Sequence, residues 1–421
     1  MIVRKREMQT GAWFKIITNY LKNIKYWRKY KMNNDPVIKT FIPYGKQYID
    51  EDDIVAVSEV LRGAYITTGP RVEIFERDLC NLTGAKYAVA IANGTAALHA
   101  ACFAAGIEEG DEVVTTPMTF AASANCILYC GGTPVFADID PDTWNISADE
   151  IEKRVTDRTK AVVAVDFTGQ AVDLDRIRDI CIRQNLILIE DAAHAIGTKY
   201  RDKYVGSIAD MTIFSFHPVK TITCGEGGAI LTDDENYYRK LLRFRTHGII
   251  HDPKLMRQKP FNGFYEQIEL GYNYRLTDFQ AALGSSQLKK LDKFSKRRAM
   301  IVDIYNRELG KIPELILQKE IPDSKTTRHI YIIRLNKKLL RASRGEFYKS
   351  LNEENVGLQV HYIPVYYHPY YQSLGYRKGL CPVAEDLYED IITIPLYYSL
   401  SDEDVYSVIE AVKKTVDKYR K

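Results

Sequence analysis

A regular alternation of short apolar runs and helical stretches, beginning near Phe41, is the feature that most constrains the fold. Short apolar runs of this kind are typical of strands that are buried on both faces of a parallel sheet. The runs are YAVAIA (87–92), DEVVTT (111–116), TPVFADI (133–139), AVVAVDF (161–167), LILIED (186–191), MTIFSF (211–216) and GGAILTD (227–233). Helical stretches lie between them, for example over residues 95–106, 119–131 and 174–185. This order predicts an α/β sheet with helices on both faces.

The character of the sequence changes near residue 290. Residues 288–309 form a long charged stretch that is typical of a helix, and a strand pattern (329–335) and an amphipathic C-terminal helix follow. A chain of 421 residues has room for two domains. We therefore expect a large domain over residues 41–290 and a smaller C-terminal α/β domain over residues 291–421 that begins with a linking helix.

Residues 1–40 differ from the rest of the chain in charge. They contain ten Lys or Arg against Glu7 and Asp35, a net charge of +8, which leaves −5 for the body of a chain whose total is +3. That balance gives the body no electrostatic support for nucleic-acid binding. Residues 11–31 are basic and aromatic, so membrane-surface contact by residues 1–31 is one interpretation. The alternative, that the functional chain starts at Met32 after a translated leader, stays open.

The cysteines and the hydropathy pattern both indicate a cytoplasmic protein. No stretch approaches the ~20 uninterrupted apolar residues of a membrane span. The seven cysteines form no CxxC pair, and no His lies at ligand spacing beside Cys126 and Cys130. We interpret them as reduced, mostly buried thiols and predict no metal site.

The segment NGTAALHA (93–100) directly follows the predicted strand 87–92. A Gly-containing turn between a strand and a helix collects backbone N–H groups and the positive end of a helix dipole at one point, which suits a phosphate. A tight helix start capped by Thr95 is an equally good interpretation of the segment by itself.

The segment LILIEDAAHA (186–195) places Asp191 at the carboxyl end of a predicted buried strand, where open α/β sheets bind ligands. His194 follows three residues later and could face the same site. A salt bridge or a supporting role explains the pair equally well in isolation, and a metal site would need more ligands.

The segment MTIFSFHPVKTITCGEGGAILTD (211–233) leads from a strand into a loop that holds Ser215 and Lys220. Because Lys220 lies among apolar residues, desolvation should lower its pKa and make its amine nucleophilic. A surface lysine beside a glycine turn is the ordinary alternative. A phosphate cradle, a strand-end Asp and a loop Lys flanked by Ser are together the parts that a pyridoxal-phosphate (PLP) site requires.

These segments resemble the DegT-type sugar aminotransferases, a branch of the aspartate-aminotransferase-like, fold-type-I PLP enzymes. The resemblance covers about residues 41–415. Its markers are FIPYGKQYIDEDDIVAV, TTGPRVEIFE, NGTAALHA, TPMTFAASAN, PVFADIDPDTWN, EDAAHAIG, FSFHPVKTITCGEGGAILT, GYNYRLTDFQAALG and VHYIPVYYHPYYQSLGY. It implies a PLP-dependent transferase fold whose large domain has a mostly parallel seven-stranded sheet.

The resemblance also implies roles for individual residues. Lys220 would be the Schiff-base lysine and the acid and base of the proton shift, and Asp191 would pair with the pyridine nitrogen. The other implied cofactor contacts are His194 near the ring hydroxyl, Phe120 on the ring face, Thr95, Ala96 and Ser215 at the phosphate, and Asn273 at the phosphate of a neighbouring subunit. The last of these implies a homodimer with composite sites. Arg275, His361 and Tyr362 are the candidate substrate contacts.

The finer resemblance is to the 4-aminotransferases of pseudaminic acid biosynthesis. It implies transfer of an amino group from L-glutamate to C4 of a UDP-linked 4-keto-6-deoxy-N-acetylhexosamine. The 4-aminotransferases that act on a UDP-4-keto-pentose in aminoarabinose synthesis share some of the same motifs. A sugar dehydratase is disfavoured because Lys220 is present, and a non-catalytic regulator is disfavoured because the whole set of site residues is present.

Overall fold

The computed structural model describes residues 36–257, 261 and 263–421, so the predictions for residues 1–31 lie outside the described part. Its centre is a seven-stranded sheet in the order β1-β9-β8-β5-β4-β2-β3. The strands are β1 (Tyr87–Ile91), β2 (Glu112–Thr115), β3 (Thr133–Phe136), β4 (Thr159–Val165), β5 (Ile187–Asp191), β8 (Met211–Ser215) and β9 (Gly228–Thr232). Only β9 pairs antiparallel, with β1 on one side and β8 on the other. The predicted mostly parallel seven-stranded sheet is confirmed.

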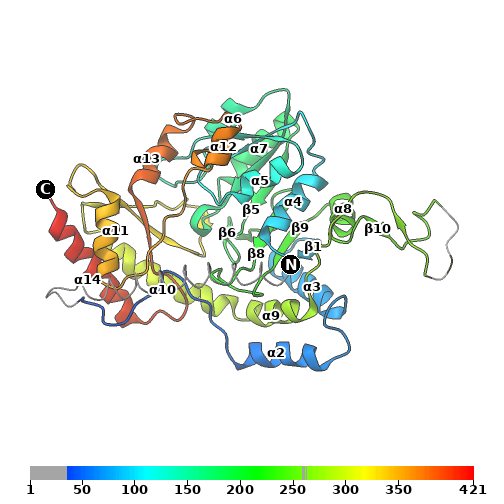
Figure 1. The fold of residues 1–421 in the computed structure, drawn as a ribbon, viewed down its shortest axis with the longest axis horizontal. Helices are drawn as coiled ribbons and strands as arrows, with labels where there is room; N and C mark the ends of the chain where they lie inside the picture. The colour runs from blue at the N-terminus through cyan, green and yellow to red at the C-terminus, as the bar shows by residue number, and fades with distance from the viewer. Residues whose placement is uncertain (1–35, 258–260, 262) are drawn as a thin grey trace, which may run out of the picture.

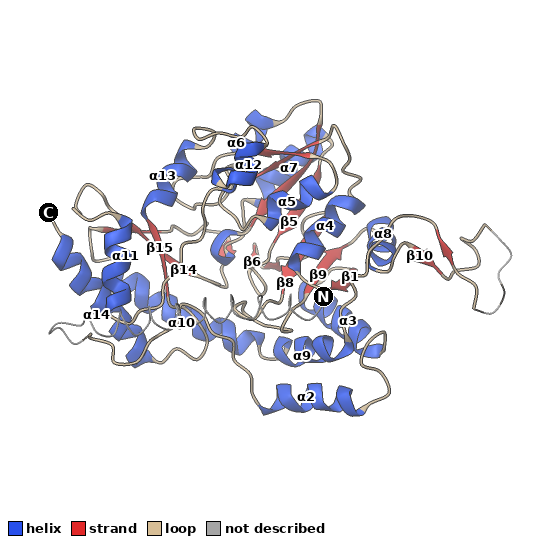
Figure 2. Ribbon diagram, viewed as in Figure 1, coloured by secondary structure: helices blue, strands red, loops and turns tan. Residues whose placement is uncertain are grey.

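Helices cover both faces of this sheet, as the strand composition predicts (Figures 1 and 2). In β4, Ala161 and Val163 face one apolar core while Val162 and Ala164 face the other. The first core is closed by α4 (Gly94–Ala104), α5 (Ala122–Tyr129) and α8 (Glu235–Arg245). The second is closed mainly by α3 (Pro70–Thr83), α6 (Ala148–Arg154), α7 (Leu174–Gln184) and α9 (Asp278–Leu288), and α2 (Glu51–Arg62) packs on α9. Because the strands are buried on both faces for most of their length, most of their residues are apolar.

The C-terminal part has its own core around a three-stranded antiparallel sheet in the order β12-β14-β15. Its elements are α10 (Leu291–Leu309), β12 (Leu315–Leu317), β14 (Tyr331–Leu335), α11 (Arg344–Glu353), β15 (Ile391–Ile394) and α14 (Asp402–Tyr419). Ile38 and Ile42 are buried in this core, so residues that precede the large sheet in sequence pack against the end of the chain. The domain boundary near residue 290 stays a prediction.

Smaller elements complete the described chain. They are β6 (Lys199–Tyr200), β7 (Lys203–Tyr204), β10 (Ile249–Ile250), β11 (Glu266–Gln267), β13 (Ser324–Lys325), α12 (Pro369–Ser373), α13 (Pro382–Asp390) and two short 3-10 turns, Phe167–Gly169 and Val365–Tyr367. The β10–β11 ribbon projects from the body (Figure 1). In the described ranges no helix is both long and apolar enough to cross a membrane.

Candidate active site

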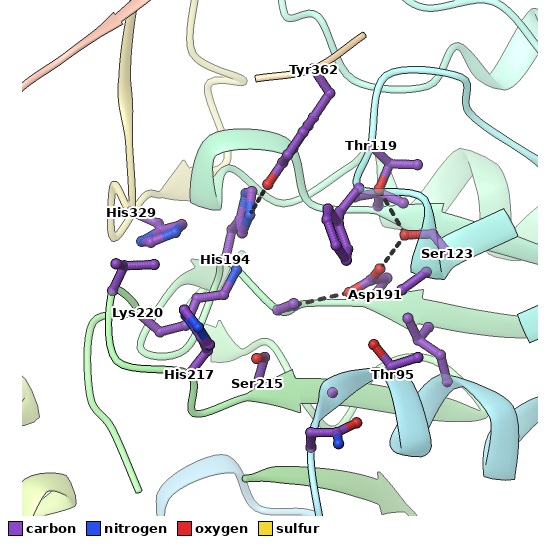
Figure 3. Close-up of a pocket in the computed structure, with 18 of the residues that line it drawn as sticks. Thr95, Thr119, Ser123, Asp191, His194, Ser215, His217, Lys220, His329 and Tyr362 are labelled. Atoms are coloured by element: carbon purple, nitrogen blue, oxygen red, sulfur yellow. Dashed lines mark hydrogen bonds between the residues drawn. The ribbon is translucent and has the colours of Figure 1, made fainter. Parts of the chain in front are cut away.

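A cavity of about 890 Å³ opens at the carboxyl ends of β4, β5 and β8, where Val165, Asp191 and Ser215 lie in its wall. Its volume is in the range of small-molecule binding sites. The start of α4 and the Lys220 loop form its floor, and residues from the C-terminal part, including His329 and Tyr362, close its far side (Figure 3). This is the edge at which open α/β sheets bind ligands.

Lys220 lies in the loop that follows β8, and the loop folds back on itself. The Lys220 amide donates to the His217 carbonyl oxygen at 2.9 Å, and the Cys224 amide donates to the Phe216 carbonyl oxygen at 3.0 Å. Burial lowers the pKa of the Lys220 amine to about 8, although the Asp191 carboxylate acts in the opposite direction. About one tenth of this amine is therefore neutral at pH 7, far more than for an ordinary lysine, and the neutral amine is the nucleophilic form.

The Asp191 carboxylate is fixed from two sides. Ser123 Oγ donates to Asp191 Oδ2 at 2.6 Å, and the Ala193 amide donates to Oδ1 at 3.1 Å. Thr119 Oγ1 lies 2.7 Å from Ser123 Oγ and extends this chain of hydrogen bonds (Figure 3). Burial raises the pKa of Asp191, while its hydrogen bonds and the nearby Lys220 charge act to lower it. Ser123 and Thr119 were not predicted from the sequence, because no spacing rule connects α5 and the residues before it with the end of β5.

The start of α4 (Gly94, Thr95 and Ala96) forms one end of the cavity, and the N-terminus of a helix can hold an anion. Asn93, and not Thr95, caps the helix, since its side chain accepts from the Ala96 amide at 2.8 Å. Thr95, Ala96 and Ser215 all line the cavity, and their predicted contact with a phosphate stays a prediction. A Cβ added to Gly94 would lie 2.9 Å from Ser215 Cβ, so only glycine allows this close approach of α4 to β8.

Three histidines meet beside Lys220. Tyr362 Oη lies 3.0 Å from His194 Nε2, and the His329 ring centroid lies 4.5 Å from that of His194. His361 Nδ1 lies 2.9 Å from Thr393 Oγ1. Burial lowers the pKa of all three histidines, and the Lys220 charge lowers it further. The pKa of His361 falls to about 4, and those of His194 and His329 lie well below the usual value. All three rings are neutral near pH 7. His329 was not predicted, because it sits in an ordinary strand pattern.

The remaining predicted residues divide into two groups. Phe120 lies in the cavity wall with 62% of its surface exposed, so its ring is open to a ligand. Asn273 and Arg275 do not line the cavity of their own chain, although Tyr274 between them does. Asn273 is exposed and forms an isolated antiparallel β-bridge with Thr246 through its backbone. Arg275 forms another with Ile91.

Comparison with known proteins identifies the family. A sequence profile of the DegT/DnrJ/EryC1/StrS aminotransferase family matches residues 47–413. The chain belongs to this family. Spore coat polysaccharide biosynthesis protein SpsC of Bacillus subtilis (strain 168) is 42% identical to this family member over 378 residues, which are 89% of this chain and 97% of SpsC.

Two solved structures share this fold. Helicobacter pylori PseC, an aminotransferase involved in the biosynthesis of pseudoaminic acid, is 33% identical with a TM-score of 0.84, over 90% of this chain and 100% of PseC. The PLP form of Spr1654 from Streptococcus pneumoniae is 31% identical with a TM-score of 0.83, over 90% and 99% of the two chains. The chain is a PLP-dependent sugar aminotransferase that uses a sugar substrate and an amino donor. The predicted family and cofactor are confirmed.

Proposed function

We propose that this aminotransferase moves an amino group from L-glutamate to C4 of a UDP-linked 4-keto-6-deoxy-N-acetylhexosamine. We assign the cavity as the active site because Lys220, Asp191 and the start of α4 all line it. The choice of sugar is supported by the similarity to PseC and by the Tyr-rich segment around His361 and Tyr362.

The residues in the cavity fit PLP. The start of α4 with Thr95, Ala96 and Ser215 would hold the phosphate, and Asp191 would hold the pyridine nitrogen in its protonated form. Phe120 would lie on the ring face and His194 near the ring hydroxyl. When bound, PLP supplies an electron sink for the carbanion that forms at the amino-bearing carbon.

Lys220 performs two tasks in this proposal. Its Nζ would hold the cofactor, and the free amine would take the proton from the donor α-carbon and return it to complete the proton shift. A pKa of about 8 suits both tasks, because the amine can accept a proton and give it back near neutral pH. The neutral rings of His194, His329 and His361 add no positive charge beside it. The 3.0 Å hydrogen bond between Tyr362 Oη and His194 Nε2 fixes the orientation of the His194 ring.

Asn273 and Arg275 would act on a second copy of the chain. We propose a homodimer in which Asn273 reaches the phosphate of the neighbouring subunit, with Arg275 beside the substrate. Their position outside their own cavity supports this arrangement.

None of the seven cysteines, all of which are described, forms a disulfide, which supports the cytoplasm as the compartment.

Product analysis with a panel of UDP- and dTDP-linked 4-keto-sugars tests the assignment. The expected result is a 4-amino product from the UDP-linked 4-keto-6-deoxy-N-acetylhexosamine and little turnover of a UDP-4-keto-pentose. Preference for the pentose would identify the aminoarabinose type of enzyme. A deoxygenated product with no gain of nitrogen would identify a dehydratase and refute the proposal.

A further inference from the structure

Two buried carboxyl groups, those of Asp166 and Glu190, lie behind the active site. Asp166 directly follows β4, Glu190 is the last residue but one of β5, and both are 0% exposed. Successive side chains of a strand point to opposite faces, so Glu190 points away from Asp191 and toward the face of Ala164, its register partner in β4. Neither carboxyl lines the large cavity.

Each of these carboxyls has one oxygen with a fixed donor and one without. The Val172 amide donates to Asp166 Oδ1 at 3.0 Å, and Thr212 Oγ1 donates to Glu190 Oε2 at 2.8 Å. The other two oxygens, Asp166 Oδ2 and Glu190 Oε1, are buried and accept from no donor among the described residues. The two side chains are within hydrogen-bonding distance of each other. The oxygens without donors are therefore the ones left to face each other.

The two carboxyls need a proton between them. Neither forms an ion pair with a Lys, Arg or His in the described ranges, and the other charge that acts on both is that of Asp191. Burial raises the pKa of Glu190 to about 7. Burial, and then the negative charge of Glu190, raise the pKa of Asp166 well above its usual range. Because two adjacent buried carboxylates are not both ionised, one keeps its proton and can donate it to the other.

The backbone connects both carboxyl-bearing residues to Asp191. Glu190 precedes Asp191 in β5, and the Asp166 amide donates to the Asp191 carbonyl oxygen at 3.1 Å. The carboxylate of Asp191 lies in the wall of the large cavity. A bond between the two carboxyls therefore joins the segments that hold the Asp191 backbone on either side.

We propose that Asp166 and Glu190 share one proton in a carboxylic acid–carboxylate hydrogen bond and act as positioning residues for Asp191. The bond ties the end of β4 to β5 at the point where Asp191 enters the cavity. The positioning role rests on the proposed contact of Asp191 with the cofactor ring, whereas the shared proton does not.

Amide substitutions test the shared proton, because an amide can replace either carboxyl but not both. In Asp166→Asn, the side-chain oxygen still accepts from Val172 and the NH₂ group donates to Glu190; Glu190→Gln does the same toward Thr212 and Asp166. Each single variant should be as stable as the wild type or more stable. The double variant places two NH₂ groups together with no acceptor between them. Its equilibrium constant for folding should lie at least about tenfold below the value that the single changes predict.

Urea unfolding of the full chain without PLP, near pH 6, measures this double-mutant cycle. Asp138 provides the control, because its carboxylate accepts only from backbone amides and β2 lies between β3, which precedes it, and β4. The effects of Asp138→Asn and Asp166→Asn should therefore add. Additive effects of Asp166→Asn and Glu190→Gln would overturn the shared proton, as would a crystal structure with Asp166 Oδ2 and Glu190 Oε1 more than about 3 Å apart.

PLP affinity, measured by absorbance titration, tests the positioning role through a second cycle. Asp166→Leu removes the bond to Glu190 and should weaken PLP binding about tenfold, and Glu190→Met should do the same, whereas Asp166→Asn should bind like the wild type. In an Asp191→Asn background, Asp166→Leu should cause little further loss, because it acts through Asp191. An equal loss in both backgrounds, or no loss in either, would overturn the positioning role.

The outcomes also separate this inference from the proposed function. If Asp191→Asn binds PLP as tightly as the wild type, the contact proposed for Asp191 fails and the positioning role fails with it, while the amide cycle still decides the shared proton. Neither measurement contains a sugar. A wrong choice of sugar substrate would therefore appear only in the product panel.

Discussion

Replacing Lys220 with Met in the cofactor-free protein should make the protein more stable at pH 7. Burial lowers the pKa of this amine from 10.5 to about 8, and each pKa unit corresponds to about 1.4 kcal/mol. Keeping the charged form buried therefore costs at most about 3.5 kcal/mol at pH 7. Because the large cavity admits water to Lys220, we expect Lys220→Met to raise the free energy of unfolding by about 1–3 kcal/mol.

The pH dependence distinguishes this effect from a simple packing gain. The folded-state pKa lies below the unfolded one, so the cost is complete below about pH 8 and disappears as the pH rises toward 10.5. Urea unfolding of PLP-stripped wild type and Lys220→Met at pH 7, 8, 9 and 10 should show an advantage that shrinks with pH. Lys296→Met, a change at an exposed lysine on α10, is the control and should have little effect. A gain that is absent at pH 7 or independent of pH would refute the claim that Lys220 is desolvated.

Three further predictions concern groups around the cavity. Ser123→Ala removes the 2.6 Å hydrogen bond to Asp191 and should lower kcat about tenfold, whereas Ser285→Ala, which removes a similar bond to Asp78, should leave kcat unchanged in the same assay. Gly94→Ala forces a Cβ to within 2.9 Å of Ser215 and should weaken PLP binding at least about tenfold by absorbance titration; unchanged affinity would contradict the close approach of α4. Burial raises the pKa of Glu190 to about 7, so folding stability should fall as the pH rises from about 4.5 through 7. In thermal melts, Glu190→Gln should make this fall less steep. An equally steep fall in the variant would contradict the prediction.

Much of the sheet could be predicted, because the strands are buried on both faces for most of their length and most of their residues are apolar. The same property hides strand direction. Residues 227–233 read like any buried strand, and only the structure shows that β9 runs antiparallel between β1 and β8. The packing of Ile38 and Ile42 on the C-terminal core likewise leaves no local pattern, since it depends on contacts hundreds of residues apart.

The candidate site was predictable where the signal is local. Asp191 ends strand β5 and Lys220 lies in the loop after β8, each within one recognisable segment, and both line one cavity. Ser123 and His329 reach the same cavity from α5 and from the segment before β14, and their neighbours in sequence indicate no chemistry. The cap of α4 shows a finer limit, because Asn93 and Thr95 are both good capping residues and only backbone geometry chooses between them.

Nitrogen transfer from labelled glutamate tests the central claim most directly. Purified full-length protein with PLP, ¹⁵N-labelled L-glutamate and the UDP-linked 4-keto-6-deoxy-N-acetylhexosamine should yield a sugar with ¹⁵N at C4, together with 2-oxoglutarate. The Lys220→Met protein should yield neither above background. A sugar that leaves the wild-type reaction without the label, or labelled sugar formed equally well by Lys220→Met, would contradict the account.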